Sequence, residues 1–237
     1  GPACDLAVDP LEGTRLCALG QEGAVSVLAA APPGTLWATS GWYMEKLVVG
    51  AEAAGAVSLE ASVGENVAGV AAGLGKPVHE VLVAVQDRPR HTELIAALRQ
   101  AGAAVVLFGD GDVMTSLRVL LPGGDLDMLL GVGGAPEGVI TACAARLLGG
   151  GMYGRLAPQS DGERTALEAA GAMSGEILGL EDLVTDGDCV FVATAITGGT
   201  MLGRPGAGPG GWRTTSLLST PDHPALIVEG YVPESAA

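Results

Sequence analysis

Between residues 81 and 148, short apolar segments alternate with helical segments, and this alternation constrains the fold more than any other feature of the sequence. Each apolar segment has the length of a strand and is followed by a loop and a helical pattern. Strands that alternate with helices of this length form βαβ units around a mainly parallel sheet. The predicted strands cover 81–86, 104–108 and 128–132, and the predicted helices cover 92–101, 113–121 and 136–148. We therefore expect an α/β fold with a mainly parallel sheet in the C-terminal half.

The predicted elements on either side of this region are more widely spaced. A strand at 5–9 leads into a turn at 10–13, and the charge-free segment 23–44 is interpreted as strand, turn and strand around Pro32-Pro33-Gly34. Ser62-Val63-Gly64-Glu65 matches a capping box, which predicts a helix that ends at Gly75. Further predictions are a helix at 163–173, a Gly/Pro loop at 203–211, and strands at 189–196, 214–218 and 225–228. These patterns show no internal repeat and no linker clear enough to cut the chain in two.

The composition indicates a folded chain that binds neither nucleic acid nor an anionic membrane. Asp and Glu outnumber Lys and Arg by 27 to 12, which gives a net charge of −15, and both kinds of partner require many basic side chains. Hydrophobic residues make up 48% of the chain and charged residues 16%, the opposite of a disordered sequence. The charge-free segment 23–44 is broken by two prolines and a glycine, so we do not interpret it as a membrane span. We expect no nucleic-acid partner and no membrane partner.

The cysteines and histidines predict neither a disulfide framework nor a histidine metal site. Cys4, Cys17, Cys143 and Cys189 are widely spaced and form no CxxC pair, so we expect them to be reduced. The three histidines are equally scattered. Because the N-terminus also carries no secretory pattern, we expect a cytoplasmic protein, or a plastid one if the source is a photosynthetic eukaryote.

Polar or glycine-rich loops follow three of the predicted strands. Ligands of open α/β sheets bind beyond the carboxyl ends of the strands, so we expect the loops at 87–91, 109–112 and 133–135 to gather in one cleft. The third loop opens a helix, whose backbone N–H groups can hold an anion. Glu137 lies in the first turn of that helix, and the alternative for it is that it only complements the helix dipole.

The strongest local signal is the hexapeptide Asp9-Pro10-Leu11-Glu12-Gly13-Thr14. It combines a carboxylate at a strand end, a second carboxylate three residues later, and a hydroxyl that can orient a water molecule. Oxygen ligands of this kind suit Mg²⁺ or Mn²⁺. The alternative is an ordinary Asp-Pro turn with a solvated glutamate.

This hexapeptide resembles the metal-binding signature of the lithium-sensitive phosphatase superfamily, which includes inositol monophosphatases and fructose-1,6-bisphosphatases. Most members have Asp where this chain has Glu12. Glu12 and four further motifs, which occur in the order found in the family, make the chain similar to class II fructose-1,6-bisphosphatases over about residues 5–156. The four motifs are Tyr43-Met44-Glu45-Lys46-Leu47, Arg88-Pro89-Arg90-His91, Asp110-Gly111-Asp112-Val113 and Gly133-Gly134-Ala135-Pro136-Glu137-Gly138-Val139-Ile140.

The resemblance implies a layered α/β sugar-phosphatase fold and a role for each matching residue. Residues 1–80 then form a partial metal-binding α+β subdomain, and 81–237 form the sugar-phosphate-binding α/β subdomain. Asp9, Glu12 and Glu137 match metal ligands for Mg²⁺ or Mn²⁺. Thr14 matches the residue that orients the attacking water, and Glu12 also touches the reacting phosphate. The positions that match substrate-binding residues are Glu12, Gly13, Thr14, Tyr43, Arg88, Pro89, Arg90, Asp110, Gly111, Asp112 and Gly134.

The chemistry of these residues agrees with such a substrate. A sugar bisphosphate needs a local concentration of cations in a chain of charge −15, and Arg88, Arg90 and a bound cation supply one. Asp110 and Asp112 suit sugar hydroxyls, which donate hydrogen bonds to carboxylates. Plain surface arginines and a solvated aspartate turn are the alternatives. The resemblance thus implies metal-dependent hydrolysis of the 1-phosphate of fructose 1,6-bisphosphate, in gluconeogenesis or carbon fixation, without a covalent intermediate.

Two other functions stay open at this stage. The resemblance also fits a dual fructose-1,6- and sedoheptulose-1,7-bisphosphatase. Members of the family carry further metal carboxylates in Asn-Thr-Ala-Asp and Gly-Glu-Gly-Glu type motifs ahead of the hexapeptide, and this sequence starts a few residues before Asp9. We therefore expect an N-terminally truncated form of the family pattern, whose alternative function is a catalytically weak phosphosugar-binding subunit. We also expect a homo-oligomer, a dimer or a tetramer.

Overall fold

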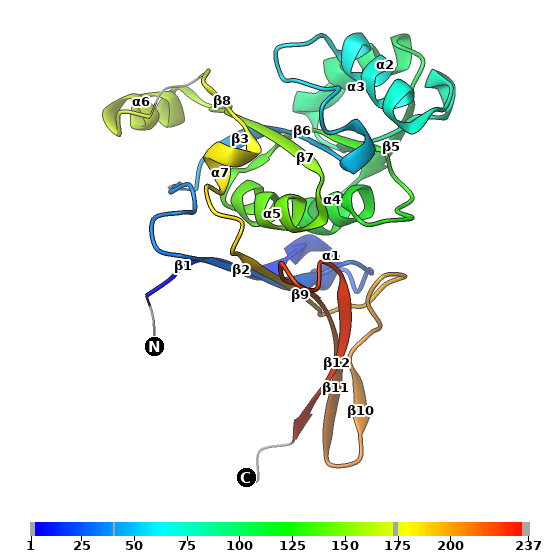
Figure 1. The fold of residues 1–237 in the computed structure, drawn as a ribbon, viewed down its shortest axis with the longest axis vertical. Helices are drawn as coiled ribbons and strands as arrows, with labels where there is room; N and C mark the ends of the chain where they lie inside the picture. Colours follow the sequence, from blue (N-terminus) through cyan, green and yellow to red (C-terminus); the bar gives the residue numbers. More distant parts are fainter. Residues whose placement is uncertain (1–2, 40, 173–174, 234–237) are drawn as a thin grey trace.

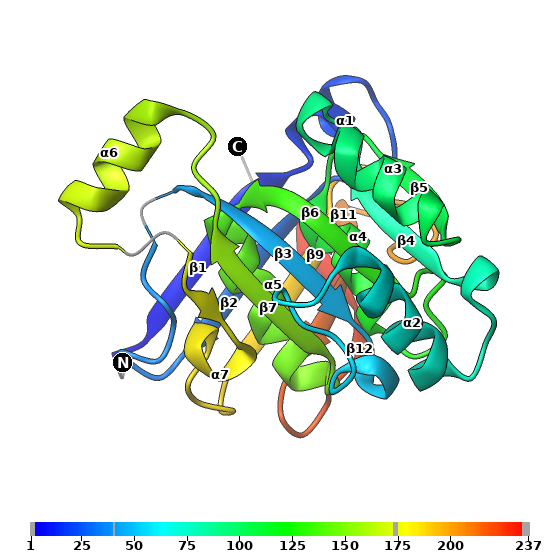
Figure 2. The same cartoon turned by 90° about the horizontal axis from the view of Figure 1, so that it is seen from above.

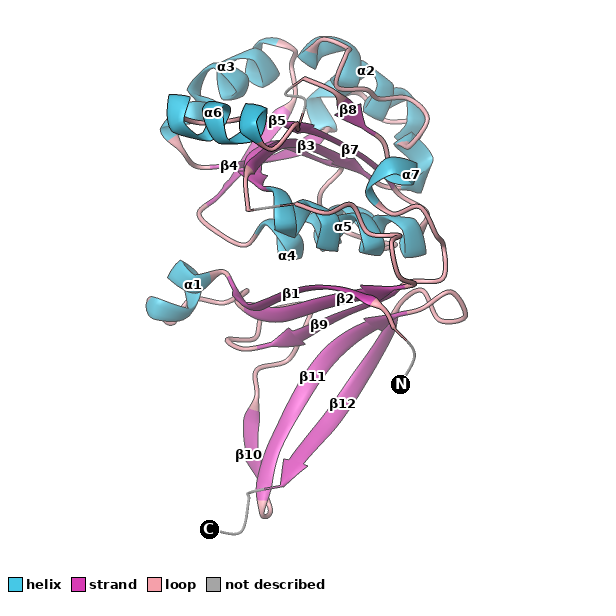
Figure 3. Cartoon of the chain, turned by 90° about the vertical axis from the view of Figure 1, so that its left-hand side faces the viewer, coloured by secondary structure: helices cyan, strands magenta, loops and turns pink. Residues whose placement is uncertain are grey.

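The computed structural model describes residues 3–39, 41–172 and 175–233, and it arranges them in alternating helix and sheet layers. Two six-stranded sheets are separated by a pair of helices, and a second pair of helices covers the outer face of one sheet (Figures 1 and 3). This layered arrangement of helices and mixed sheets confirms the predicted α/β class.

The first sheet contains the predicted βαβ units. Its strand order is β5-β4-β6-β3-β7-β8, and β4 pairs in parallel with β5 and β6 (Figure 2). β3 pairs antiparallel with both β6 and β7, so β6 and β7 run in the same direction on either side of it. The strands are β3 (Tyr43–Val49), β4 (Leu82–Gln86), β5 (Ala104–Phe108), β6 (Met128–Gly134), β7 (Gly151–Leu156) and β8 (Ile177–Leu178).

Strands β4, β5, β6 and β7 run in the same direction, as expected of a mainly parallel sheet. The expected parallel pairing is wrong at β6 and β7, because both of them pair antiparallel with β3. The strand predicted after Pro32-Pro33-Gly34 forms only an isolated bridge at Leu36, and the regular strand starts later, at Tyr43. This strand inserts between β6 and β7 and makes their contacts antiparallel. Its apolar end, Leu47–Val49, is fully buried, which is typical of a central strand covered on both faces.

The second sheet is antiparallel throughout and holds the remaining strands in the order β1-β2-β9-β11-β10, with β12 beside β11. β10, β11 and β12 extend away from the body of the molecule as a ribbon (Figure 3). Residues 1–80 contribute strands to both sheets. The strands are β1 (Asp5–Glu12), β2 (Val25–Ala31), β9 (Val190–Ala195), β10 (Gly206–Gly208), β11 (Gly211–Ser219) and β12 (Leu226–Pro233).

Two buried helices, α4 and α5, fill the space between the sheets (Figure 3). α5 presents small residues such as Ala142 and Ala144 to its surroundings, which allows close approach of the strands on both sides. The capping box at Ser62 and Glu65 is present as predicted. The helix predicted to reach 173 ends at Ala169, and Met173 lies outside the described residues. The helices are α1 (Thr14–Ala18), α2 (Val63–Leu74), α3 (Thr92–Gln100), α4 (Asp112–Leu120), α5 (Ala135–Leu148), α6 (Asp161–Ala169) and α7 (Leu180–Leu183).

None of the described helices has both the length and the apolar character that crossing a bilayer requires.

The packing of β9 against the buried helices provides a test of this core. Phe191 is completely buried, whereas Leu6, on β1 of the same sheet, is 60% exposed. We expect Phe191→Ala to lower the free energy of unfolding by about 3–5 kcal/mol, and Leu6→Ala to change it by less than about 0.5 kcal/mol. Urea unfolding curves measure both values, and equal losses would show that the helix pair and the second sheet do not share a core.

Candidate active site

A cleft of about 520 Å³ opens at the carboxyl ends of β4, β5 and β6, beside the end of β1. It brings together residues that are more than 120 positions apart in the sequence. Of the residues singled out from the sequence, it is lined by Asp9, Glu12, Gly13, Thr14, Tyr43, Arg88, Arg90, Asp110, Asp112, Gly134 and Glu137. Pro89 starts the short helical turn between the two arginines, and Gly111 lies behind the cleft wall, near Glu12.

The end of β1 positions the first two carboxylates through a β-bulge. β1 continues to Glu12, and one extra residue between Asp9 and Glu12 shifts its register with β2. The predicted turn at 10–13 is therefore a bulge, and Pro10 fits there because a bulge does not need its missing N–H group. Asp9 accepts a hydrogen bond from the backbone of Leu11 at 3.0 Å. Gly13 then adopts a left-handed conformation (φ 79°) that starts α1 at Thr14.

Glu12 is buried against the N-terminus of α4. The residue is only 4% exposed, and its Oε1 accepts a hydrogen bond from the backbone N–H of Val113 at 3.0 Å. Its Oε2 is buried with no hydrogen-bond partner among the described residues. Burial raises the pKa of Glu12 to about 8, although the Val113 N–H acts in the opposite direction. A buried, unpaired carboxylate oxygen is costly unless something binds it.

Glu137 comes from the first turn of α5, directly after β6. Its Oε2 is also buried without a partner among the described residues. The carboxylate lies over Gly134, where an added Cβ would be 1.9 Å from Oε2. A side chain at this position would therefore displace the carboxylate of Glu137.

These carboxylates provide an oxygen-only donor set at one cleft, which is the chemistry of a Mg²⁺ or Mn²⁺ site. The unpaired oxygens of Glu12 and Glu137 fit such an ion. Within residues 3–39, 41–172 and 175–233, no three His, Cys, Asp or Glu side chains are grouped closely enough to hold a metal ion by themselves. In this arrangement an ion would have at most two of the carboxylates of Asp9, Glu12 and Glu137 as ligands, and the others would come from substrate or water.

The two predicted arginines have different environments. Arg90 donates two hydrogen bonds to the carbonyl of Val132, at 3.1 and 2.7 Å, and one to Gln86 at 2.9 Å. Its guanidinium also lies 5.2 Å from the ring centroid of Tyr43, a cation–π distance. Arg88 lies 3.9 Å from Asp110. Arg90 is consequently held in one orientation at the cleft wall, whereas Arg88 is less constrained.

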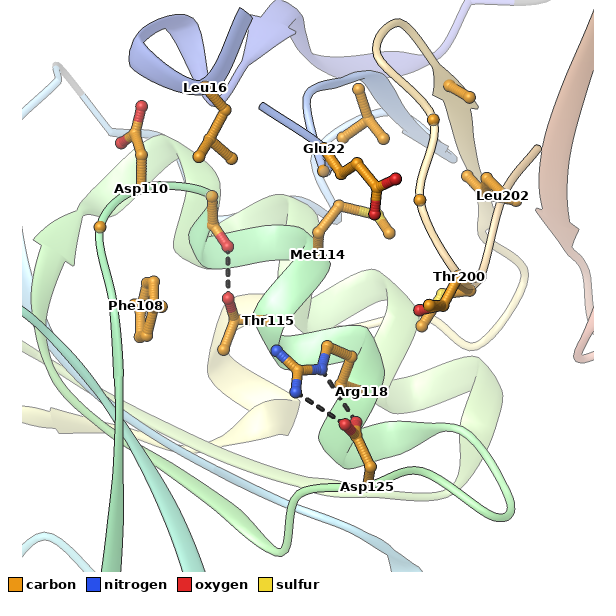
Figure 4. A pocket seen from close by; sticks show the side chains of 18 residues that line it. Leu16, Glu22, Phe108, Asp110, Met114, Thr115, Arg118, Asp125, Thr200 and Leu202 are labelled. Atoms are coloured by element: carbon orange, nitrogen blue, oxygen red, sulfur yellow. Dashed lines mark hydrogen bonds and ion pairs between the residues drawn. The ribbon is translucent and has the colours of Figure 1, made fainter. Parts of the chain in front are cut away.

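A second pocket of about 420 Å³ lies on the other side of Asp110 (Figure 4). Its walls include Leu16, Met114 and Leu202. Its arginine, Arg118, is bound to Asp125 by two hydrogen bonds, at 2.9 and 2.7 Å. This pair satisfies the guanidinium, so the cleft with Arg88 and Arg90 is better suited to a phosphate group.

Sequence reasoning missed two buried residues that hold the cleft together. His91 connects the loop after β4 to β6: its Nδ1 hydrogen-bonds the carbonyl of Gln86 at 2.7 Å, and its Nε2 accepts from the N–H of Val132 at 2.8 Å. Burial lowers the pKa of His91, which favours the neutral ring that these bonds need.

Lys46 on β3 binds Asp112. The available sequence signal for Lys46 was a lysine within a mostly apolar strand. The cleft lining also contains Leu11, Gly41, Gln86, Gly133 and Pro136.

The shifted pKa of Glu12 predicts how stability depends on pH. Because the folded-state pKa of Glu12 is about 8, raised from 4.5, its protonated side chain contributes stability that is fully present below pH 4.5. This stability is lost as the pH rises through about 8. Glu12→Gln removes this titration while keeping the shape of the side chain. In the presence of a chelator, we expect the variant to unfold at a higher temperature than the wild type at pH 9, with a difference that shrinks toward pH 5. A difference that is constant from pH 5 to 9 would contradict the raised pKa.

Comparison with known proteins agrees with this geometry. Residues 1–225 match the family described as "Bacterial fructose-1,6-bisphosphatase, glpX-encoded". The chain is similar to "Fructose-1,6-bisphosphatase 1 class 2" of Escherichia coli (strain K12), and to "Fructose-1,6-bisphosphatase class 2" of Escherichia coli O6:H1 and of Shigella flexneri. Each is 40% identical over 215 residues, which cover 85% of this chain and 64% of the relative. The chain thus spans less than two thirds of the length of these relatives, and it belongs to the class II fructose-1,6-bisphosphatase family.

Proposed function

We propose that this chain carries the sugar-phosphate-binding cleft, and three metal-binding carboxylates, of an enzyme that hydrolyses the 1-phosphate of fructose 1,6-bisphosphate. The observation that supports this most is that two arginines and five carboxylates line one cleft. Membership of the family supports the same reaction. The products are fructose 6-phosphate and inorganic phosphate.

The arginines bind the anionic substrate. Arg90 is fixed by Gln86, Val132 and Tyr43, so it is oriented before substrate arrives and loses little entropy on binding. Arg88 is close enough to Asp110 to bind a phosphate next to a sugar hydroxyl. Asp110 and Asp112 accept hydrogen bonds from the hydroxyl groups, and this distinguishes a sugar phosphate from inorganic phosphate.

The carboxylates and Thr14 act at the reacting phosphate. Asp9, Glu12 and Glu137 would hold Mg²⁺ or Mn²⁺, and a bound ion would supply charge neutralisation of the phosphate oxygens and a lower pKa for a bound water. Thr14, the first residue of α1, lines the cleft beside Glu12 and orients the attacking water through its hydroxyl group. Gly13, between these two residues, has a left-handed conformation that favours glycine.

Phosphate release from fructose 1,6-bisphosphate in the presence of Mg²⁺ or Mn²⁺ tests the proposal. We expect turnover by the wild type, and a loss of about 100-fold or more in Asp9→Asn and in Glu137→Gln, because even residues behind metal ligands cost about 10- to 100-fold. Asp222→Asn and Glu168→Gln change exposed carboxylates elsewhere in the chain in the same way and should leave the rate unchanged.

Two results would contradict the proposal in different ways. Full activity in both Asp9→Asn and Glu137→Gln would remove these residues from the reaction. Binding of fructose 1,6-bisphosphate by the wild type without phosphate release would instead favour a phosphosugar-binding subunit. Calorimetric titration with the sugar bisphosphate separates this case from a protein that does not bind the substrate at all.

A further inference from the structure

Lys46 forms a buried ion pair directly behind the cleft. The residue is only 2% exposed, and its Nζ lies 2.6 Å from Oδ2 of Asp112. The same Nζ donates to the carbonyl of Gly134 at 3.2 Å. Lys46 is on β3, Asp112 is the first residue of α4, and Gly134 precedes α5. One ammonium group therefore contacts the two helix N-termini that border the cleft.

Two glycines leave room for this pair. An added Cβ at Gly133 would be 1.9 Å from Oδ2 of Asp112 and 2.8 Å from Nζ of Lys46. At Gly138 it would be 3.4 Å from Cδ of Lys46 and 2.9 Å from the sulfur of Met44. A side chain at Gly133 would push Asp112 or the lysine out of place, whereas one at Gly138 would collide mainly with Met44 beside the lysine. The surrounding backbone is thus built around the lysine side chain and its contact with Asp112.

A buried ion pair of this kind is poorly explained by stability alone. Removing two charges from water costs much of what their attraction returns, and well-packed apolar residues often stabilise a protein equally well or better. Asp112 lines the cleft, so one of the two charges can also contact a ligand. A function in the cleft gives a physical reason for the pair.

We propose that Lys46 is a positioning residue for sugar recognition, which holds one oxygen of Asp112 so that the other can accept a hydrogen bond from a substrate hydroxyl. This inference rests on the proposed function, because it concerns how that cleft recognises its sugar. Lys46 itself does not contact the substrate. Its effect reaches the ligand only through Asp112.

The chain provides a matched control for the loss of such a pair. Nζ of Lys76 lies 2.5 Å from Oδ2 of Asp127, and Asp127 also accepts a hydrogen bond from the backbone of Leu82 at 2.6 Å. Neither Lys76 nor Asp127 lines the cleft. Lys76→Met therefore removes a similarly short lysine–aspartate contact, from a more exposed lysine, without altering the cleft.

The experiment compares a sugar substrate with one that lacks hydroxyl groups. For the wild type, Lys46→Met, Asp112→Asn, the double variant and Lys76→Met, kcat and KM are measured with fructose 1,6-bisphosphate and with p-nitrophenyl phosphate. We expect Lys46→Met to lower the ratio of the two kcat/KM values by about 10-fold, the size of one lost hydrogen bond to a charged group. The loss should lie mainly in KM for the sugar. Lys76→Met should leave the ratio unchanged.

The double variant tests whether Lys46 acts through Asp112. If it does, adding Lys46→Met to Asp112→Asn causes no further fall in the ratio, and this comparison holds even if Lys46→Met alone does not fold. An additional fall in the double variant, or equal losses on both substrates, would overturn the inference. A wild type that hydrolyses neither substrate would instead overturn the proposed function. An active wild type with an unchanged ratio in Lys46→Met would overturn the role of Lys46 alone.

Discussion

The N-terminus of α4 joins the two sheets at the point where the cleft opens, and the candidate site depends on this junction. On one side, Glu12 from β1 accepts the N–H of Val113. On the other side, Lys46 from β3 binds Asp112. Both contacts are buried, and both are made by residues of the first turn of α4. The helix thus fixes both a carboxylate of the antiparallel sheet, which lines the cleft, and a lysine of the mixed sheet, which lies behind it.

This junction also explains why so many glycines surround the site. Side chains at Gly133 and Gly134 would collide with Asp112 and Glu137, so the close approach of β6 to both carboxylates requires residues without a Cβ. Gly13 adopts a left-handed conformation that separates the end of β1 from the start of α1 by one residue, and Gly111 adopts one directly before α4. Such sharp transitions place carboxylates and backbone N–H groups in the same small volume. Burying these polar groups lowers the stability of the fold, which is expected at a functional site.

The sequence predicted which loops gather in one cleft better than it predicted the pairing of the strands, for physical reasons. The order β4-α3-β5-α4-β6-α5 follows from local hydrophobic periodicity, and the loops after β4, β5 and β6 meet because parallel strands end at the same edge. The insertion of β3 beside β6 could not be read from periodicity, because Lys46 and Glu45 interrupt its apolar pattern and find their partners, Asp112 and Arg155, far along the chain. The bulge at Asp9 depends likewise on the register between β1 and β2. Local patterns therefore identified the loops that line the cleft, whereas the arrangement of the strands depends on long-range pairing.

The central claim is that carboxylates from β1 and α5 hold a divalent cation against a sugar phosphate. The most direct test is a crystal structure of the protein soaked with Mn²⁺ and fructose 6-phosphate, with anomalous scattering recorded for the metal. The account predicts an anomalous peak within coordination distance of Asp9, Glu12 or Glu137, and a sugar whose hydroxyl groups face Asp110 and Asp112. Manganese bound only elsewhere, or a sugar phosphate seated outside this cleft, would contradict it.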